Sequence, residues 1–213
     1  MGGVPRHVVI PVADEPSNPS LPYALATIRK HTDYIPVTVG KDHGLTELHI
    51  PTVQDRDKFT NTDLAMRTAC ETEWVSDPFV WWMDDVFIFE PASIPDWHMG
   101  QLPHTIDPTS SSYHRRKVET RRILETLGLP TLDYELHTPL LVHQALMLEA
   151  LAIGGDKRTI YGNLQGTGTY HPDVKTRSED RHALSPGPYV STTPRSWRIH
   201  RTTIVQRTAT MST

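Results

Sequence analysis

The sequence has little cysteine, no excess of positive charge and no long apolar run, and each absence excludes a class of protein. Its single cysteine, Cys70, cannot form an internal disulfide, so we expect a reducing, cytoplasmic environment. Lys and Arg number 21 against 25 Asp and Glu, which excludes a globally basic nucleic-acid binder but not a local basic groove. No apolar run reaches the roughly 18 residues of a transmembrane helix. The first residues lack the apolar core of a signal peptide, so we expect neither a membrane partner nor a leader.

Proline and histidine are abundant, with 18 and 12 of the 213 residues. Proline predicts many loops and short elements, and the histidines need an account because imidazole serves both metal binding and proton transfer. The length is that of one domain that can bury a core without disulfides or structural metals. We expect one domain over residues 1–200 and a polar, Thr-rich tail over residues 201–213.

Strands and helices alternate along the first ninety residues. Short β-branched runs predict strands at residues 7–12, 36–40, 48–50 and 78–83. Helical spacing of apolar residues predicts helices at residues 21–31 and 61–69, the second capped by Thr60 or Asn61. This order implies right-handed crossovers, and therefore an α/β fold with a mostly parallel sheet flanked by helices. Ligands of such sheets gather beyond the carboxyl ends of the strands.

The second half of the chain is less regular. Residues 91–112 resemble an exposed loop, and residues 113–127 predict a basic helix ended by glycine and proline. Residues 133–139 are polar and extended, and residues 140–153 predict an apolar helix. Few periodic segments follow, and residues 161–175 are expected to be irregular.

Two adjacent carboxylates, Asp84 and Asp85, follow the most apolar of the predicted strands. Unpaired charge beside a core is unfavourable. A divalent cation, Mg²⁺ or Mn²⁺, removes that penalty and keeps coordination positions for substrate phosphates. We therefore predict that the pair holds a metal ion against a nucleotide diphosphate. The alternative is a solvated turn or a helix N-cap, in which aspartate is common.

The acidic pair belongs to a longer pattern that resembles the compact GT-A glycosyltransferases, which use nucleotide sugars. The residues that carry this resemblance are 9–12, 23–30, 37–41, 58–62 and 79–85. Met83 stands where the DxD-type motif of that family has its first acid, so by motif position Asp85 is the more direct metal ligand and Asp84 its neighbour on the nucleotide sugar.

Two segments together carry a narrower resemblance: Trp82-Met83-Asp84-Asp85-Val86-Phe87 and Leu136-His137-Thr138-Pro139. These two segments are similar to the capsule-type sugar-phosphate transferases called stealth proteins. They also resemble small phage glycosyltransferases encoded beside TET/JBP-type oxygenases, which are proposed to glycosylate 5-hydroxymethylcytosine in DNA. For a phage enzyme the expected cytoplasm is that of the host.

The resemblance implies a UDP-sugar as donor, with Mn²⁺ or Mg²⁺. The expected contacts to the nucleotide sugar are Pro11, Val12, Ala13, Lys41, Asp42, Lys58, Asn61 and Asp84. Among them Asn61 can instead cap a helix, and Lys41, Asp42 and Lys58 can be solvated surface residues. Enzymes of this fold often take a further metal or phosphate ligand from a late histidine, for which His171 is the candidate.

Asp133, Glu135 and His137 alternate along one segment and share a face if it is extended. An inverting transferase needs a carboxylate or imidazole that deprotonates the acceptor hydroxyl, whereas a retaining one needs no such base in that place. The resemblance implies the acid at Glu135 or Asp133, and the His-x-Pro pattern of the stealth proteins at His137. The alternative is a surface strand that ends in a helix cap.

Residues 113–122 hold five cations and one acid on the predicted basic helix. Such a cluster suits phosphates. The predicted acceptor contacts are Arg115, Arg116, Lys117, Arg121 and Arg122, with Lys175 as a further contact to acceptor or pyrophosphate. Helical spacing places Tyr113, Leu124 and Leu127 inward, Arg115 and Arg122 toward solvent and the other cations at the edges. The alternative is a solvated charged helix.

Three functions remain compatible with the sequence. The first is metal-dependent transfer of a hexose or N-acetylhexosamine from a UDP-sugar to a hydroxyl of 5-hydroxymethylcytosine in phage DNA. The second is transfer of sugar or sugar-phosphate to a glycan, and the third is a nucleotide- or metal-binding module without turnover. The sugar, the stereochemical outcome and the oligomeric state do not follow from the sequence.

Overall fold

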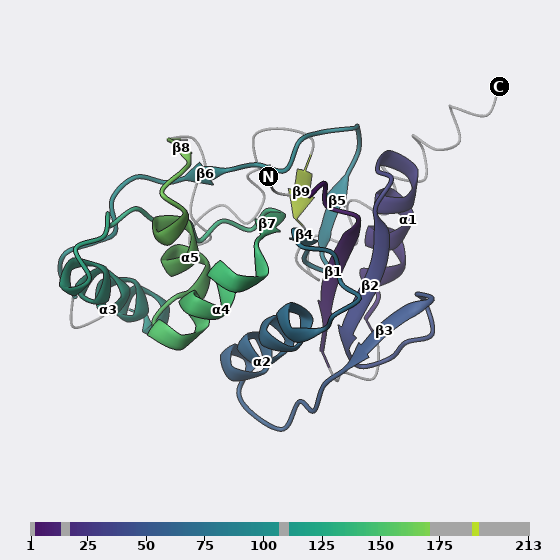
Figure 1. Ribbon diagram of the computed structural model, residues 1–213, viewed down its shortest axis with the longest axis horizontal. Helices are drawn as coiled ribbons and strands as arrows, with labels where there is room; N and C mark the ends of the chain where they lie inside the picture. The colour runs from purple at the N-terminus through teal and green to yellow at the C-terminus, as the bar shows by residue number, and fades with distance from the viewer. Residues whose placement is uncertain (1–2, 14–17, 107–110, 171–188, 192–213) are drawn as a thin grey trace.

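The computed structural model describes residues 3–13, 18–106, 111–170 and 189–191. Its main sheet has five strands in the order β3-β2-β1-β4-β7. The strands are β1 (His7–Val12), β2 (Ile35–Gly40), β3 (Leu48–Pro51), β4 (Phe79–Trp81) and β7 (Leu140–Val142). The first four run parallel, and β7 pairs with β4 in the antiparallel direction. Helices flank the sheet (Figure 1), which confirms the predicted α/β class in a single compact domain.

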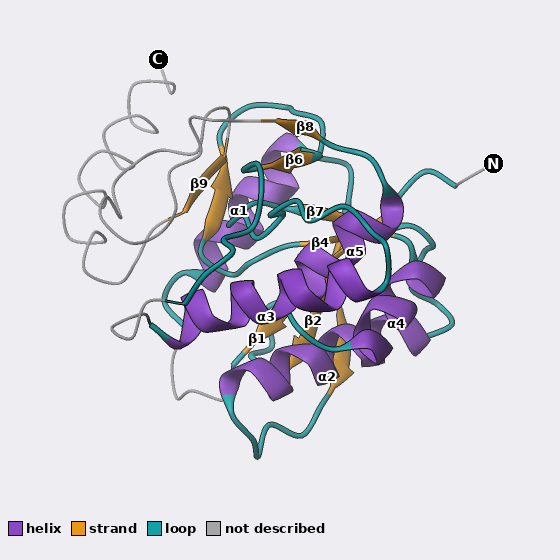
Figure 2. Ribbon diagram, turned by 90° about the vertical axis from the view of Figure 1, so that its left-hand side faces the viewer, coloured by secondary structure: helices purple, strands orange, loops and turns teal. Residues whose placement is uncertain are grey.

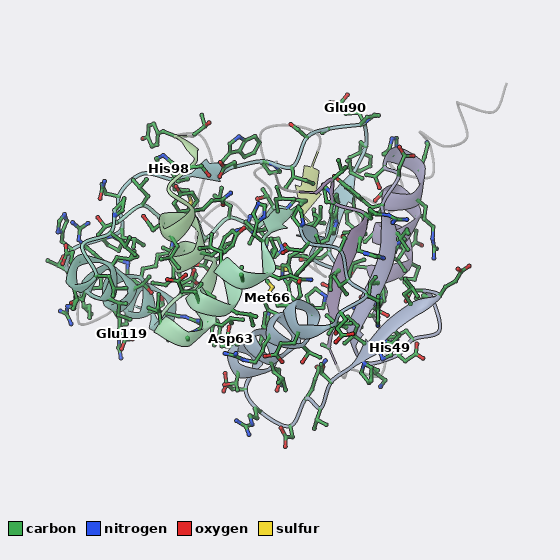
Figure 3. The ribbon with its side chains drawn as sticks, in the orientation of Figure 1. His49, Asp63, Met66, Glu90, His98 and Glu119 are labelled. Carbon is green, nitrogen blue, oxygen red and sulfur yellow. The ribbon has the colours of Figure 1, made fainter. Side chains whose placement is uncertain are left out.

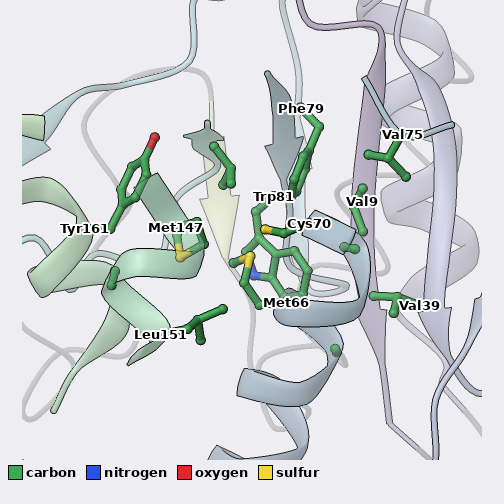
Figure 4. Close-up of a cluster of buried hydrophobic side chains, with 14 of the residues drawn as sticks. Val9, Val39, Met66, Cys70, Val75, Phe79, Trp81, Met147, Leu151 and Tyr161 are labelled. Atoms are coloured by element: carbon green, nitrogen blue, oxygen red, sulfur yellow. The ribbon is translucent and has the colours of Figure 1, made fainter. Parts of the chain in front are cut away.

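Two apolar layers hold the sheet, one on each face. Helix α1 (Leu21–His31) packs on Val8 and Ile10, whereas α2 (Lys58–Glu71) and α4 (Gln144–Ile153) share a core with Val9. Figure 4 shows this second layer, in which Met66 and Met147 lie beside the sheet residue Trp81. Because both faces are covered, the strands are apolar at nearly every position.

The remaining elements lie around this centre. Helix α5 (Lys157–Gln165) packs against α4, and α3 (Ser112–Thr126) packs against α5. Strand β5 (Val86–Ile88) pairs with β9 (Tyr189–Ser191), and β6 (Trp97–His98) pairs with β8 (Thr169–Tyr170). Figure 2 shows β6 and β8 side by side. Across the described ranges, no helix is both long enough and apolar enough to cross a membrane.

The predicted elements of the first half are confirmed, apart from one cap. The helix at residues 21–31 has the predicted bounds, and the predicted strands match β1 to β4 within a few residues. Helix α2 begins three residues earlier than expected, at Lys58, because the Asp57 carboxylate accepts the backbone N–H groups of Phe59 and Thr60. The predicted cap by Thr60 or Asn61 is therefore wrong.

The second half departs more from expectation. The apolar run at 140–153 is a strand and then a helix, because its first three residues pair with β4. Helix α5 covers residues 157–165, so the expectation that residues 161–175 are irregular is wrong for 161–165. Asp156 caps this helix, and its side chain accepts the N–H of Thr159 at 2.8 Å. Residues 133–139 form no strand, so the expected common face of their side chains is not built.

Candidate active site

The acidic pair lies at the tip of a tight turn beyond strand β4. The N–H of Val86 donates to the carbonyl of Met83 at 3.2 Å, so Asp84 and Asp85 occupy the two central positions. The fully buried indole of Trp82 closes the base of this turn by donating from Nε1 to the carbonyl of Val86 at 2.9 Å. A rigid apolar base therefore presents both carboxylates at the carboxyl edge of the sheet.

Asn18, which lies between β1 and α1, holds Asp84. Its Nδ2 donates to the Asp84 carboxylate, and its Oδ1 accepts the N–H of Leu21 at 3.1 Å and the hydroxyl of Ser20 at 3.4 Å. These bonds fix the orientation of the amide, because only its nitrogen can face a carboxylate. Burial raises the pKa of Asp84, the Asn18 bond opposes that rise, and the charge of Asp85 adds to it.

His137 meets the acidic turn from the other half of the chain. Its Nε2 lies 2.8 Å from Oδ1 of Asp85, and the two side chains are 33% and 24% exposed. The contact follows from the sheet: Leu140 is the register partner of Trp81, so the residues before β7 lie beside those after β4. An ionised Asp85 only accepts hydrogen bonds, so Nε2 donates and the lone pair of a neutral imidazole is on Nδ1.

Asp133 and Glu135 face helix α3 rather than the acidic turn. Asp133 is buried, and it pairs through Oδ2 with Lys117 at 2.5 Å and accepts the N–H of Glu135 through Oδ1 at 3.1 Å. Glu135 is half-buried and hydrogen-bonded to the Tyr113 side chain. Burial first, and then the charge of Asp156, raise the pKa of Glu135 to about 7. A carboxyl with this pKa can both take up and release a proton near neutral pH.

The cations of α3 do not form the expected exposed collar. Lys117 and Arg121 are buried, at 6% and 9% exposure. Arg121 donates from Nε to Glu125 at 2.8 Å and from Nη1 to a backbone carbonyl at 2.6 Å. Arg116 donates to the carbonyl of Gly155 at 2.9 Å, with its guanidinium 4.5 Å from the centre of the Phe59 ring.

Only Arg115 and Arg122 of the predicted acceptor contacts on α3 are exposed, as predicted for them. Glu119 lies with them on the outer side of this helix (Figure 3). Leu124 is buried as expected, whereas Leu127 is 49% exposed, so its predicted inward orientation is wrong.

The predicted nucleoside contacts lie at the ends of β1 and β2. Val12 is buried, and its carbonyl accepts Nε2 of Gln54 at 2.6 Å, while Pro11 is half-buried and Ala13 is exposed. Gly40 has a φ of +116°, and a Cβ there would lie 2.2 Å from the Val12 carbonyl oxygen, so only glycine fits.

A hollow of about 310 Å³ lies just beyond this edge. It is lined by Lys41, Thr52, Val53, Gln54 and Asp55. Asp42 is exposed, and its Oδ1 accepts the N–H of Gly44 at 2.7 Å in a local turn.

The start of α2 supplies the last described candidates. Lys58 is exposed, whereas the Asn61 side chain exchanges two hydrogen bonds with the backbone of Arg56, at 2.7 and 3.2 Å. Asn61 thus bridges a loop and does not cap α2, whose cap is Asp57, while its contact to the nucleotide base stays a prediction. His171 and Lys175 lie outside the described residues.

The donor set of the acidic turn fits Mg²⁺ or Mn²⁺. Asp84 and Asp85 each use one oxygen in the bonds to Asn18 and His137, and a carboxylate has a second oxygen to offer. No three His, Cys, Asp or Glu side chains of the described ranges form a complete metal site. Two carboxylates suffice for Mg²⁺, which completes its shell with water and substrate phosphates.

Sequence reasoning missed three residues that shape this region: Asn18, Tyr113 as the partner of Glu135, and Arg158, which binds the backbone after His137. No local pattern marks them, since each acts on a residue far away in the chain. With these residues in place, the molecule is an α/β protein with an acidic site at the sheet edge where the loops after β1 and β4 meet.

Comparisons with known proteins give no family. No family model and no curated protein match the chain. A crystal structure of 4-diphosphocytidyl-2C-methyl-D-erythritol synthase is 14% identical with a TM-score of 0.48, over 95% of this chain and 100% of that one. The apo-form glycosyltransferase GlyE of Streptococcus pneumoniae TIGR4 is 9% identical with a TM-score of 0.31, over 59% and 39% of the two chains. Both similarities are weak, so function rests on the residues of the site.

Proposed function

We propose that the protein is a metal-dependent glycosyltransferase that moves a hexose or N-acetylhexosamine from a UDP-sugar to a hydroxyl. The observation that carries the proposal is the hydrogen bond between His137 and Asp85. It joins the two segments whose resemblance to nucleotide-sugar enzymes was drawn from sequence, 82–87 and 136–139, and it does so at the sheet edge where α/β folds bind their ligands.

The donor side of the site consists of the acidic turn and the ends of β1 and β2. Asp84 and Asp85 would hold Mg²⁺ or Mn²⁺, which neutralises the charge of the leaving diphosphate when bound. The hollow beside Lys41 accepts the nucleoside, with Lys41 near its ribose or base. His137 keeps Asp85 in place through its Nε2. His171 as a metal or phosphate ligand and Lys175 as a contact to acceptor or pyrophosphate stay predictions.

On the acceptor side we infer that the acceptor hydroxyl binds next to Glu135, which serves as its general base although its hydrogen bond is with Tyr113 of α3 and not with the acidic turn. The oxygen of the acceptor hydroxyl bonds to the anomeric carbon, the bond from that carbon to the diphosphate oxygen breaks, and UDP leaves with the electron pair. The hydroxyl proton passes to the Glu135 carboxylate. A pKa of about 7 suits this role because it lies close to the operating pH. Asp133 does not fit it, since both of its oxygens are engaged within the protein.

DNA that carries 5-hydroxymethylcytosine is our first candidate for the acceptor, on the resemblance of 82–87 and 136–139 to phage enzymes. A hydroxymethyl group in the major groove is accessible without base flipping, whereas one that is read in a pocket requires it. Transfer of sugar or sugar-phosphate to a glycan is the second candidate, because the same segments resemble the stealth proteins.

UDP release tests the proposal. The purified chain is incubated with UDP-glucose, UDP-galactose or UDP-N-acetylglucosamine, with Mn²⁺ or EDTA, and with hydroxymethylated DNA, plain DNA or an oligosaccharide. Mn²⁺-dependent release that requires hydroxymethylated DNA is the expected result. UDP release with the oligosaccharide and with neither DNA establishes a glycan as the acceptor. If the chain binds UDP-sugar but releases no UDP under any condition, the result contradicts the proposal of an enzyme. It then supports a nucleotide-binding module without turnover.

A further inference from the structure

Arg158, in the first turn of α5, donates three hydrogen bonds to the two residues that follow His137. Nη1 donates to the carbonyl of Thr138 at 2.6 Å, and Nη2 donates to the Thr138 hydroxyl at 2.8 Å and to the carbonyl of Pro139 at 3.3 Å. Thr138 is 1% exposed, so water does not serve these acceptors. A rigid guanidinium fork can satisfy all three together, whereas a lysine ammonium is a single point charge.

The charge of this guanidinium is retained although the side chain is half-buried. Burial lowers the pKa of Arg158 to about 10, while Asp156 and Glu135 act in the opposite direction. Arg158 is therefore cationic at neutral pH, and its hydrogen bonds are charge-assisted and stronger than neutral ones. The same side chain thus lies in the field of Glu135 and is bonded to the backbone that follows His137.

Helix α5 holds the rest of this segment through Tyr161, three residues after Arg158. The Tyr161 hydroxyl donates to the carbonyl of Leu141 at 2.9 Å and accepts the N–H of His143 at 3.0 Å. Residues three apart share one face of a helix. Figure 1 shows α5 beside β7 and α4. One helix face therefore fixes the backbone from Thr138 to His143, which leads from His137 through β7 to α4.

We propose that Arg158 is a positioning residue that keeps the His137 imidazole on Asp85. Proline at position 139 restricts the backbone after Thr138, and Arg158 fixes the carbonyls of both residues. The backbone next to His137 is therefore held in one conformation, which orients the His137 side chain. The inference deepens the proposed function, on which its catalytic consequence rests, but the His137–Asp85 contact can be measured whether or not the chain turns over a nucleotide sugar.

Nitrogen chemical shifts of His137 test the geometry directly. Protein labelled with ¹⁵N-histidine is recorded at one fixed pH, with His137 assigned from the His137→Gln spectrum. Asp85→Ala marks the shifts that accompany loss of the contact. Arg158→Lys is expected to move the His137 chemical shifts most of the way to their values in Asp85→Ala. Thr138→Val, which removes one hydrogen bond and disturbs the fold less, is expected to move them part of the way.

Arg29→Lys is the matched control, since Arg29 also donates from Nη2 to a loop carbonyl, that of Leu45, at 2.9 Å. It is expected to leave the His137 signals unchanged. His137 signals of Arg158→Lys and Thr138→Val that coincide with those of the unmodified chain, in proteins with native circular dichroism, overturn the proposal.

Kinetics separate positioning from donor binding. In the UDP-release assay, we expect Arg158→Lys to lower kcat at least tenfold with little change in the KM for the UDP-sugar, and Arg29→Lys to change neither. A loss confined to KM contradicts positioning of a reacting group. An unmodified chain that releases no UDP contradicts the proposed function instead, and the His137 shifts then decide on Arg158 alone.

Discussion

His137 and Asp85 are separated by 52 positions in the chain, and their side chains share a hydrogen bond of 2.8 Å. Strand β7 brings them together, because it enters the sheet antiparallel to β4 and so begins at the edge where β4 ends. The acidic turn comes from the first half of the chain and the imidazole from the second. The contact between them therefore depends on the pairing of β4 with β7.

Asn18→Ala is expected to weaken Mn²⁺ binding about 10- to 100-fold, which is the usual effect of losing a side chain that orients a metal ligand. Asn18 holds one Asp84 oxygen and favours the charged form of this buried carboxyl. Electron paramagnetic resonance of free Mn²⁺ during a titration measures the affinity. Ser20→Ala is the control, since its hydroxyl makes only a 3.4 Å bond to the Asn18 amide. Equal affinities of Asn18→Ala and the unmodified chain contradict this role.

Glu135→Gln is expected to make the stability of the protein less dependent on pH. The folded chain keeps the Glu135 proton up to a pH of about 7, whereas the unfolded chain loses it near the ordinary value of 4.5. The unfolded state therefore binds fewer protons between these values, and the free energy of unfolding falls by up to about 3 kcal/mol as the pH rises through them. Urea denaturation at pH 4.5 and pH 8 measures the difference.

The matched control for this stability effect is Glu119→Gln, on the exposed side of α3. Glu119→Gln should leave the difference between the free energies of unfolding at the two pH values as it is in the unmodified chain. A Glu135→Gln protein with the same pH dependence as the unmodified chain shows that Glu135 titrates normally.

Turnover should follow the same carboxyl group. If Glu135 accepts the hydroxyl proton, kcat/KM for the acceptor rises as the pH passes through about 7 and then levels off. Glu135→Gln should lower kcat about 10²- to 10⁴-fold, as loss of a general base does. If Glu135→Gln keeps the rise of kcat/KM with pH, another group accepts the hydroxyl proton. His137→Gln is then the next variant to measure.

Lys117→Met is expected to destabilise the protein by about 3–5 kcal/mol, because it leaves the Asp133 carboxylate buried without a partner. The two side chains are 7% and 8% exposed and 2.5 Å apart. Arg115→Met changes an exposed cation on the same helix and should stay within about 0.5 kcal/mol of the unmodified chain. Chemical denaturation compares them, and similar midpoints for both variants contradict a structural role of the buried pair.

The parts of the fold that depend on local sequence were predictable, and those that depend on distant partners were not. The helix at 21–31 has an apolar face of its own, and β1 is a β-branched run, so both follow from periodicity. Leu140–Val142 has the apolar pattern of the helix that follows it and becomes a strand only because β4 lies beside it. Tertiary pairing here overrides the local preference.

The same distinction applies to the site. Asp85 and His137 were predicted separately from residue type and motif, but their contact depends on the register of β7. Helical spacing placed Lys117 at the edge of a solvated face, and its burial follows from Asp133, which lies in a segment with no regular structure. Periodicity describes one helix, whereas a buried ion pair needs both partners.

If DNA is the acceptor, α3 can contribute far fewer phosphate contacts than its five cations suggest, because Lys117 and Arg121 are buried. Each phosphate contact adds about 0.9 to the slope of log affinity against log salt. The double variant Arg115→Ala/Arg122→Ala is therefore expected to lower this slope by about 2 on hydroxymethylated duplex DNA. Fluorescence anisotropy between 50 and roughly 200 mM salt measures it.

Lys30→Ala removes an exposed cation from α1 and is the control for a general change of charge. It should leave the slope within about 0.3 of the unmodified chain, because no phosphate contact is lost. A slope that Arg115→Ala/Arg122→Ala does not change excludes α3 as the contact. Binding that does not depend on salt at all excludes phosphate recognition as the basis of acceptor choice and favours the glycan acceptor instead.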